Sequence, residues 1–540
     1  MPNFFNGPFD LFRTATFFMN KTLQAAPKIM EATVLQTKAV QNYWTGLFGY
    51  VNSFMAPSFG AINSFIATEK IKLMQESPAD TIKDYSDLFA QNIRLAGDGL
   101  RGGMAAMSTF SCNKLSEGIS AWVDTYRDGN GNDIARFAAR QEELMSVAVH
   151  EYPKAIREVK PEYGFCFENG GYVKVAETER FEVYQVLPLN DEVQPRADGK
   201  PILIIPPYVL GANILAFLPG EQRSYVHCFA GQGIPTYVRI LKDIDTTPAV
   251  QLMTGEDDAL DTRFFCERLM LRHEGRKVTL NGFCQGGYHA LAALLSGELD
   301  EVTDALITCA TPIDGTRSKS LKEYLSSVPP RFRDLSYCMK TLPNGNQVVD
   351  DRIMGWVYKL RSMESESAIS AFHRDLSLFD NQNGRKMKIN KTASAVNHWI
   401  TYDQKDLPAG ITRMSFASYS TPVDKDGTLP VKLFGRKLNF KRLKEMGTPW
   451  LICIADKDDL VDKEASLAPL EHIDAEVCVF PKGHAAMATS WSIPTSECAL
   501  HLRFCRPGSP LPLVGEKFRG PVCFHLDLEG EQAGIIKSAS

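Results

Sequence analysis

The chain has 540 residues, of which 44% are hydrophobic and 23% are charged, and its formal net charge is −5. A chain of this length is expected to form two or three domains, and the composition is typical of a globular protein with an ordinary apolar core. The small net charge argues against proteins that bind polyanions, so we expect no nucleic-acid partner.

The cysteines indicate a reducing environment. All twelve are scattered, without paired spacing, a C-x-x-C zinc pattern or a secretory signal, as is usual in cytoplasmic proteins. We therefore expect a cytoplasmic location, no metal and no cofactor. The apolar run 201–219 is broken by Pro206 and Pro207. It is interpreted as a buried strand followed by a loop, and no transmembrane segment is expected.

Residues 1–160 are predicted to form a helical region, because Ala, Leu, Met, Gln, Lys and Glu dominate and β-rich runs are few. Helices are expected at 81–111 and 134–159. Two interpretations stay open for an apolar stripe at the start: docking on a hydrophobic surface or partner, and packing on the helix's own domain. The stripe consists of Phe5, Phe9, Phe12, Met19 and Leu23.

The segment 128–133 resembles the opening of a calcium-binding loop. Two positions break the pattern, since Asp133 stands where the turn glycine belongs and Ala139 where the bidentate glutamate belongs. We interpret the segment as a polar turn between two helices.

From about residue 163, short strands replace the long helical pattern. The first two, 171–175 and 181–186, alternate polar and apolar residues like antiparallel edge strands. The later strands are continuous apolar runs between helices, which indicates a parallel sheet covered on both faces. These strands are 202–205, 236–240, 277–281, 305–309, 450–454 and 476–480, and the helices are 221–232, 257–272, 288–295 and 463–472.

The stretch Gly282-Phe283-Cys284-Gln285-Gly286-Gly287 joins a β-prone segment to a helix-forming one. A reactive side chain between glycines on a tight strand–turn–helix is the nucleophile elbow of an α/β-hydrolase. The glycines tolerate a strained backbone, and the N–H groups of the following helix favour a thiolate or oxyanion. Cys284 is therefore the candidate nucleophile. A buried cysteine in an ordinary turn is the alternative for this motif alone.

The expected fold is α/β: an α/β-hydrolase core with a mostly parallel sheet, a cap insertion and a preceding helical domain. The regular alternation stops after Asp314, and this fold places its cap at such an insertion. The expected parts are 1–160 for the helical region, 161–314 for the first part of the core, 315–440 for the cap, and 441–540 for the second part of the core with a C-terminal tail.

Two further motifs supply partners for Cys284, because a cysteine nucleophile needs a base and the base needs an orienting carboxylate. His484 follows strand 476–480, and an acidic cluster follows strand 450–454. Both lie at carboxyl ends of strands, where open α/β sheets build their sites. The chain order of nucleophile, acid and histidine is that of this fold. The acid is one of Asp456, Asp458 and Asp459, and the other histidines, His289, His398 and His472, are interpreted as packing or surface residues.

In the expected mechanism, His484 takes the thiol proton and the carboxylate fixes the ring tautomer, so that the thiolate of Cys284 attacks an acyl carbonyl. The oxyanion is expected to be held by the main-chain N–H groups of Gln285 and of Val209, the latter in the loop after the first core strand. The product is a thioester acyl-enzyme, which stays activated. Its acyl group can pass to an alcohol or to water.

Five separated motifs within residues 150–490 together resemble the polyhydroxyalkanoate synthases, which polymerise 3-hydroxyacyl-CoA into storage polyester. The spacing in that family selects Asp458 as the acid and leaves Asp456 and Asp459 as solvated turn residues. The motifs are Ile202–Leu210 with Ile214–Pro219, Gly282–Gly287, Tyr402–Gly410, Gly427–Leu438 leading to Gly447-Thr448-Pro449, and Asp458 with Gly483-His484.

The resemblance implies that Cys284 carries the acyl group, that His484 activates Cys284, and that Asp458, with or without His484, helps to activate the 3-hydroxyl of the next unit. The substrates would be 3-hydroxyacyl-CoA and the growing polyester chain. The resemblance also links the helical N-terminal region to a homodimer, to phasin-type granule proteins and to the surface of cytoplasmic polyester granules.

The sequence departs from the family pattern in three places. Residues 459–463 lack the His, Pro and Trp that follow the catalytic Asp, Thr401-Tyr402 replaces a Trp-Asn pair, and no Trp-rich ending follows Met487. These departures bear on chain-length control, substrate preference and polymerisation itself. The alternative functions are a cysteine esterase, thioesterase or depolymerase on the same scaffold, and a non-catalytic granule-associated protein.

Overall fold

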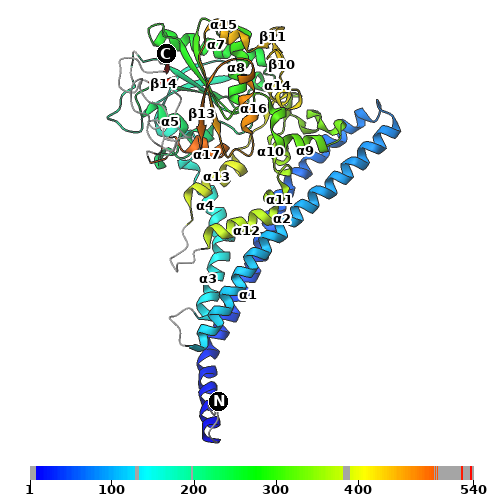
Figure 1. The fold of residues 1–540 in the computed structure, drawn as a ribbon, viewed down its shortest axis with the longest axis vertical. Coiled ribbons are helices and arrows are strands. Elements are labelled where there is room, and N and C mark those ends of the chain that lie inside the picture. The colour runs from blue at the N-terminus through cyan, green and yellow to red at the C-terminus, as the bar shows by residue number, and fades with distance from the viewer. Residues whose placement is uncertain are drawn as a thin grey trace. The chain divides into compact units, whose positions relative to one another are not determined.

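The computed structural model describes residues 8–127, 133–195, 197, 199–380, 389–491, 493, 495–496, 524–526 and 535–537. The chain folds into two compact units (Figure 1). The first, here called the helical unit, comprises residues 1–60, 89–158 and 356–394. The second, here called the sheet unit, comprises residues 61–88, 159–355 and 395–540.

The helical unit is built from two long helices and several short ones. Its apolar core joins α1, α3 and α12 through Leu47, Leu144 and Leu376. The predicted helical N-terminal region is therefore confirmed. The helices that contribute to the unit are α1 (Pro8–Lys72), α2 (Pro78–Arg127), α3 (Ile134–Ser146), a π-helical turn (Val147–Glu151), α4 (Tyr152–Glu158), α10 (Asp351–Leu360), α11 (Met363–Glu366) and α12 (Ala368–Phe379).

The calcium-like segment lies mostly outside the described residues, which omit 128–132. Its last residue, Asp133, caps α3, because its carboxylate accepts a hydrogen bond from the main-chain N–H of Arg136 at 3.0 Å. The same carboxylate is 2.9 Å from the Lys28 ammonium. Asp133 thus has the ordinary role of a helix N-cap.

The apolar stripe of the N-terminus is only partly described. Phe5 and the side chains of Phe9 and Phe12 lie outside the described part of the chain. Met19 and Leu23 are exposed on α1. The docking role of the stripe stays a prediction.

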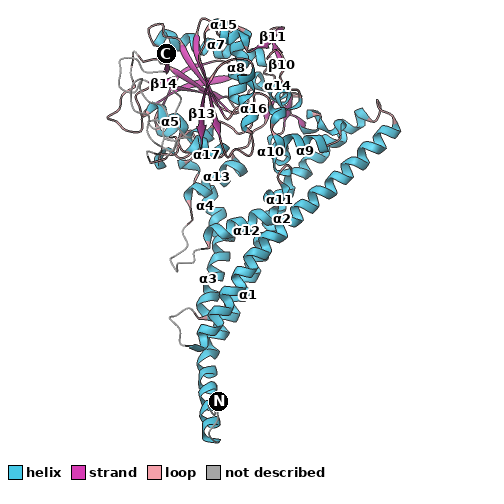
Figure 2. Cartoon of the chain, viewed as in Figure 1, coloured by secondary structure: helices cyan, strands magenta, loops and turns pink. Residues whose placement is uncertain are grey.

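The sheet unit contains an eight-stranded sheet in the order β1-β2-β4-β3-β5-β6-β12-β13 (Figure 2). β2 pairs antiparallel with β1 and β4, and all other neighbours are parallel. The predicted α/β-hydrolase core with a mostly parallel sheet is therefore confirmed. The strands are β1 (Tyr172–Glu177), β2 (Phe181–Val186), β3 (Ile202–Ile205), β4 (Thr236–Leu241), β5 (Val278–Phe283), β6 (Thr303–Cys309), β12 (Trp450–Ala455) and β13 (Glu476–Phe480).

Helices cover both faces of this sheet. On one face, α5 (Tyr225–Ala230) and α17 (His484–Thr489) share an apolar core with Ile204. On the other, α7 (Gly255–Arg272) and α8 (Gln285–Ser296) share a second core with Leu203. Adjacent residues of β3 thus face different cores, as the alternation of side chains along a strand requires.

The segment between β6 and β12 carries most of the remaining elements. It includes the predicted cap, 315–440, whose role over the site stays a prediction, as do the domain boundaries. In addition to α10–α12, the segment contains α9 (Lys319–Ser327), α13 (Lys391–Tyr402), α14 (Ala409–Ser420), α15 (Lys441–Met446), a sheet of β7 (Met339–Thr341), β8 (Gln347–Val349) and β9 (Leu407–Pro408), and a hairpin of β10 (Thr428–Leu433) and β11 (Arg436–Asn439).

The other α-helices and strands are short. They are α6 (Pro248–Gln251), α16 (Lys463–Leu467), and the pair β14 (Phe524–Leu526) and β15 (Ile535–Lys537). Within the described residues, no helix combines the length and the hydropathy that a membrane-spanning segment needs.

Candidate active site

Cys284 lies at the sharp turn between β5 and α8, with φ 50° and ψ −123°. A residue with a side chain rarely adopts this backbone, and such strain is common at functional sites. The neighbouring glycines make the turn possible. A Cβ atom at Gly282 would lie 2.3 Å from the Cα of Gly287, and one at Gly286 would lie 2.2 Å from the main-chain oxygen of Ile205. The segment therefore has the geometry of a nucleophile elbow.

Asp458 and His484 are in direct contact at the ends of β12 and β13. Nδ1 of His484 is 2.7 Å from Oδ2 of Asp458. The other carboxylate oxygen accepts hydrogen bonds from the main-chain N–H groups of Leu460 and Val461, both at 2.9 Å. Three partners thus fix the carboxylate, whose side chain is only 1% exposed. The contact assigns the proton of the neutral ring to Nδ1.

The second ring nitrogen of His484, Nε2, is buried and makes no hydrogen bond of good geometry to any described residue. Cys284 is nevertheless close enough to influence it. Burial alone would lower the pKa of His484, but the charge of Cys284 and the contact with Asp458 raise this pKa to about 10. Cys284 and Asp458 thus favour the imidazolium form of His484, and hydrogen bonds between such groups tighten when substrate binds.

The structure thus brings Cys284, Asp458 and His484 together, and their catalytic roles stay a proposal. Asp456 and Asp459 are exposed on the loop that carries Asp458. The family spacing therefore selected the one acid of the three that is buried against the histidine.

Two of the remaining histidines pack against aromatic rings. The ring of His398 lies 5.3 Å from that of Tyr163, and the ring of His472 lies 5.8 Å from that of Phe440. Both contacts are consistent with the packing role expected from the sequence.

The two residues predicted to form the oxyanion hole contact each other. The main-chain N–H groups of Val209 and Tyr208 donate to Oε1 of the Gln285 side chain, at 2.9 and 3.1 Å. The Val209 N–H is therefore already occupied. It reaches a substrate oxygen only by sharing its hydrogen between two acceptors or after Oε1 withdraws. The main-chain N–H of Gln285 begins α8 directly after Cys284, where the other donor is predicted.

A buried polar network continues from the Gln285 side chain. Its Nε2 donates to Oγ of Ser415 on α14 at 2.6 Å, and this oxygen is 2.9 Å from Nε2 of His289 on α8. Nδ1 of His289 is 3.6 Å from a carboxylate oxygen of Asp258 on α7. Burial lowers the pKa of His289 to about 4, so the ring is neutral at pH 7. The Ser415 hydroxyl has two acceptors within reach, Nε2 of His289 and the main-chain oxygen of Ile411 at 3.2 Å, and the tautomer of the ring decides between them.

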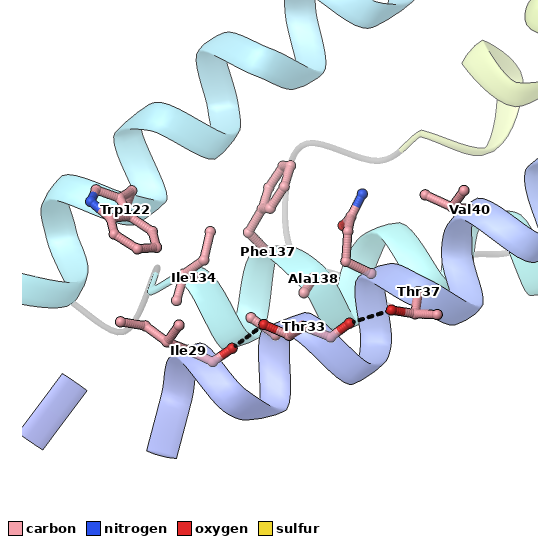
Figure 3. A pocket seen from close by; sticks show the side chains of 10 residues that line it. Ile29, Thr33, Thr37, Val40, Trp122, Ile134, Phe137 and Ala138 are labelled. Carbon is pink, nitrogen blue, oxygen red and sulfur yellow. Dashed lines mark hydrogen bonds between the residues drawn. The ribbon is translucent and has the colours of Figure 1, made fainter. Parts of the chain in front are cut away.

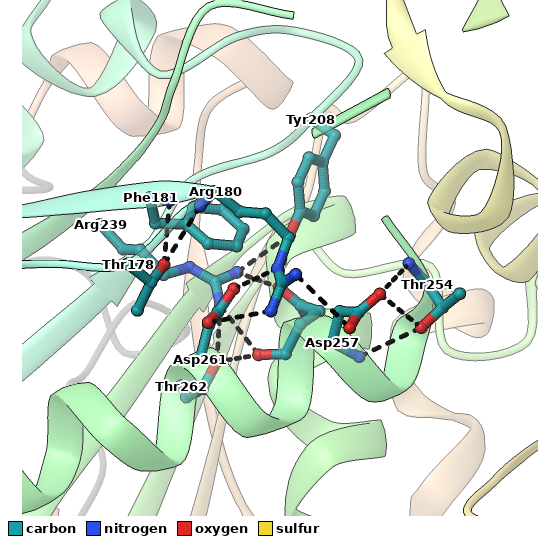
Figure 4. A network of polar contacts seen from close by, with 10 residues as sticks. Thr178, Arg180, Phe181, Tyr208, Arg239, Thr254, Asp257, Asp261 and Thr262 are labelled. Carbon is teal, nitrogen blue, oxygen red and sulfur yellow. Dashed lines mark hydrogen bonds and ion pairs between the residues drawn. The ribbon is translucent and has the colours of Figure 1, made fainter. Parts of the chain in front are cut away.

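Asp258 also forms a buried ion pair with Arg239 on β4, at 2.7 Å. The Tyr208 hydroxyl donates to Asp258 at 2.5 Å and accepts from Arg239 at 3.1 Å. Figure 4 shows Arg239 and Tyr208 within this network, and the guanidinium lies 4.2 Å from the centre of the Phe181 ring. The Tyr208 hydroxyl thus supplies one of the hydrogen bonds that a buried charge pair needs, whereas Nε of Arg239 makes none to a described residue.

A cavity of about 250 Å³ lies beside the loop that carries Tyr208 and Val209. Asp403, in the family motif 402–410, lines it and accepts hydrogen bonds from the Tyr163 hydroxyl at 2.9 Å and from Asn213 at 2.8 Å. This motif is thus tied to the segment after β3. Other lining residues include Pro206, Pro207, Gly211, Lys242 and Lys405.

A second cavity, of about 490 Å³, lies in the helical unit (Figure 3). It is apolar, and its walls come from α1, α3 and Trp122 of α2. None of the described residues that line either cavity belongs to the predicted triad.

No family model and no curated protein matches the chain. Solved structures that resemble it include several esterases. They include naproxen esterase (carboxylesterase NP) from Bacillus subtilis, at 11% identity over 63% of this chain and 93% of that one with a TM-score of 0.32. A carboxylesterase of Nitrososphaera gargenis has 14% identity over 58% and 90%, with a TM-score of 0.32. A thermophilic esterase of Thermogutta terrifontis has 15% identity over 59% and 93%, with a TM-score of 0.28. Matches at this level carry no argument about reaction or substrate.

Proposed function

We propose that the chain is an acyl-transfer enzyme with Cys284 as its nucleophile. The observation that carries the proposal is the 2.7 Å contact between His484 and Asp458, beside a cysteine on a strained elbow. His484 takes the thiol proton and the sulfur adds to the acyl carbonyl of an ester or thioester. The main-chain N–H of Gln285 donates to the oxyanion. Collapse of this intermediate breaks the bond to the leaving group, which takes the proton from His484, and the acyl group stays on sulfur as a thioester.

A polyester synthase is the finer proposal, with 3-hydroxyacyl-CoA as donor and the 3-hydroxyl of the next unit as acceptor. Its support is the set of five sequence motifs. The departure from the family pattern at 459–463 leaves the acid in place, because main-chain groups of Leu460 and Val461 hold Asp458. A homodimer, phasin-type partners and granule attachment through α1 belong to this finer proposal alone.

A cysteine esterase or thioesterase is the second candidate, with water as the acceptor. It requires only the triad, an oxyanion donor and access for water. No family model or curated protein matches that would favour a synthase. The two candidates share the acyl-enzyme and differ only in what removes the acyl group from it.

The test compares the wild type with Cys284→Ala, using 3-hydroxybutyryl-CoA and a p-nitrophenyl butyrate ester. Release of CoA or nitrophenol that is lost in Cys284→Ala supports acyl transfer through this residue. Cys112→Ser, which changes an exposed cysteine, is the control and should match the wild type. Insoluble polymer among the products favours the synthase, and free acid alone favours the hydrolase. Equal release by Cys284→Ala and the wild type would overturn the proposal.

A further inference from the structure

Two successive main-chain N–H groups, those of Tyr208 and Val209, converge on one oxygen, Oε1 of Gln285, at 3.1 and 2.9 Å. Converging main-chain donors are the usual means of binding an oxyanion. Here a neutral amide of the same chain satisfies them. The Gln285 side chain therefore either competes with a substrate oxygen for these donors or holds the loop that carries them.

The other end of the amide decides between these roles. Its Nε2 donates to Ser415 at 2.6 Å, and the Ser415 hydroxyl contacts His289 at 2.9 Å. Gln285, Ser415 and His289 are 5%, 7% and 1% exposed. Withdrawal of the amide would leave buried donors and acceptors unsatisfied, which is costly in a protein interior. The amide is thus anchored at both ends and is not a mobile plug.

Tyr208 is held at both ends as well. Its main-chain N–H contacts Gln285, and its hydroxyl donates to Asp258 at 2.5 Å. Nδ1 of His289 lies 3.6 Å from Asp258 and makes no hydrogen bond to a described residue, so the anchors of Tyr208 on α8 and on α7 are separate. Two anchors fix the position of Tyr208 relative to the elbow more firmly than a single hydrogen bond does.

We propose that Ser415 is a positioning residue for acyl transfer, acting through Gln285 to hold Tyr208 and Val209 against the nucleophile elbow. It touches no reacting atom. This inference rests on the proposed function, because the loop is predicted to supply an oxyanion donor. Because the Gln285 amide stays in place, the Val209 N–H reaches the oxyanion by sharing its hydrogen with Oε1, and the anchored amide holds this N–H in position before reaction.

The variant that tests the proposal is Ser415→Ala, with Ser418→Ala as its matched control. Both serines are buried on α14. Among the described residues, the Ser418 hydroxyl bonds to the main-chain oxygen of Ser415 in its own helix at 2.8 Å, whereas the Ser415 hydroxyl bonds both within the helix and to Gln285. Ser415→Thr retains the hydroxyl and should restore most of the rate of thiol release that Ser415→Ala loses. If Ser415→Ala fails to fold, Gln285→Met removes the same link with little change in size.

Three measurements separate positioning from a general structural defect. Thiol release in a single turnover should slow by about 10- to 100-fold in Ser415→Ala, less than the roughly 100- to 1000-fold that follows direct loss of an oxyanion donor. Alkylation of Cys284 by iodoacetamide, which needs no oxyanion hole, should stay within about twofold of the wild type. Amide hydrogen exchange at Tyr208 and Val209 should accelerate. None of these should change in Ser418→Ala.

Unchanged exchange at Tyr208 and Val209 in Ser415→Ala would overturn the positioning role. Faster thiol release in this variant would also overturn it, because the Gln285 amide would then be a competitor of the substrate oxygen. Failure of the proposed function is a separate result. It would be seen if the wild type released no thiol, or if Cys284→Ala released thiol at the wild-type rate. In that case the exchange measurement still decides whether Ser415 positions the loop.

Discussion

Replacing Asp458 by asparagine should slow acylation of Cys284 by roughly 100-fold, because the isosteric amide cannot stabilise the His484 imidazolium. The carboxylate is buried, lies 2.7 Å from Nδ1 and is held by two main-chain N–H groups. The substitution therefore removes a charge and changes the preferred ring tautomer with little change in shape. In the serine triad the corresponding change costs about 10⁴-fold. The effect here should be smaller, since a thiol is a better nucleophile than a hydroxyl.

The magnitude follows from the electrostatics of the ring. The pKa of His484 is about 10, against an ordinary value of 6.5. This difference of about 3.5 corresponds to roughly 5 kcal/mol favouring the imidazolium. Because burial lowers this pKa, the combined contribution of Cys284 and Asp458 exceeds that net value, so the loss of Asp458 should remove at least roughly 2 kcal/mol, or at least about 30-fold in rate.

The assay is single-turnover thiol release from 3-hydroxybutyryl-CoA at pH 7, with Asp456→Asn and Asp459→Asn as controls. Both control residues are exposed on the same loop, and both variants should keep the wild-type rate. An Asp458→Asn rate within about threefold of the wild type would refute the reasoning, since that corresponds to less than 1 kcal/mol. A loss of the same size in either control would refute the choice of acid.

The pH dependence of stability has a definite sign. The pKa of His484 in the folded protein is raised above 6.5, to about 10. Its contribution to the free energy of unfolding is therefore fully present below about pH 6.5 and is lost as the pH rises through about 10. Because Asp458→Asn removes part of this contribution, its stability deficit should shrink between these two pH values in urea unfolding curves.

Two further substitutions test the fold around the site by urea unfolding. Gly286→Ala should destabilise the protein by roughly 1–3 kcal/mol or more, which is the usual cost of overpacking a core. The reason is that the new Cβ would lie 2.2 Å from the main-chain oxygen of Ile205. Gly97→Ala, where nothing lies within 4 Å, should be neutral or stabilising, and equal losses in both variants would contradict the steric argument. Arg239→Met should cost roughly 3–5 kcal/mol, because it leaves the buried carboxylate of Asp258 without its ion-pair partner. A loss below about 1 kcal/mol would show that the pair contributes little.

The proximity of Cys284, Asp458 and His484 could be predicted from the sequence because each of them belongs to a local pattern. Cys284 follows an apolar strand and lies between glycines, and His484 follows another apolar strand. The chain order expected for this fold, which is nucleophile, acid and then histidine, connects the two residues with the acidic cluster between them. The choice among three neighbouring acids needed the family spacing, since the sequence does not show which of them turns inward. The buried contact of Asp458 agrees with that choice.

The network behind the loop could not be predicted in the same way. Gln285 and Ser415 are 130 residues apart and meet only because α8 and α14 pack on the same face of the sheet. Neither Ser415 nor Asp258 belongs to a motif, and a serine in a helix is usually unremarkable. His289 was interpreted as a packing residue, and its polar contacts depend on the same tertiary arrangement.

The loop after β12 shows why the acid tolerates a departure from the family pattern. Leu460 and Val461 hold Asp458 through main-chain N–H groups at 2.9 Å. Main-chain donors are present whatever side chain a residue carries, proline excepted. Substitutions in this loop can therefore change its side chains while the carboxylate keeps its orientation toward His484. Exchange of the side chains at 459–463 should therefore leave thiol release in a single turnover close to the wild-type rate, and a loss as large as that of Asp458→Asn would contradict the main-chain argument.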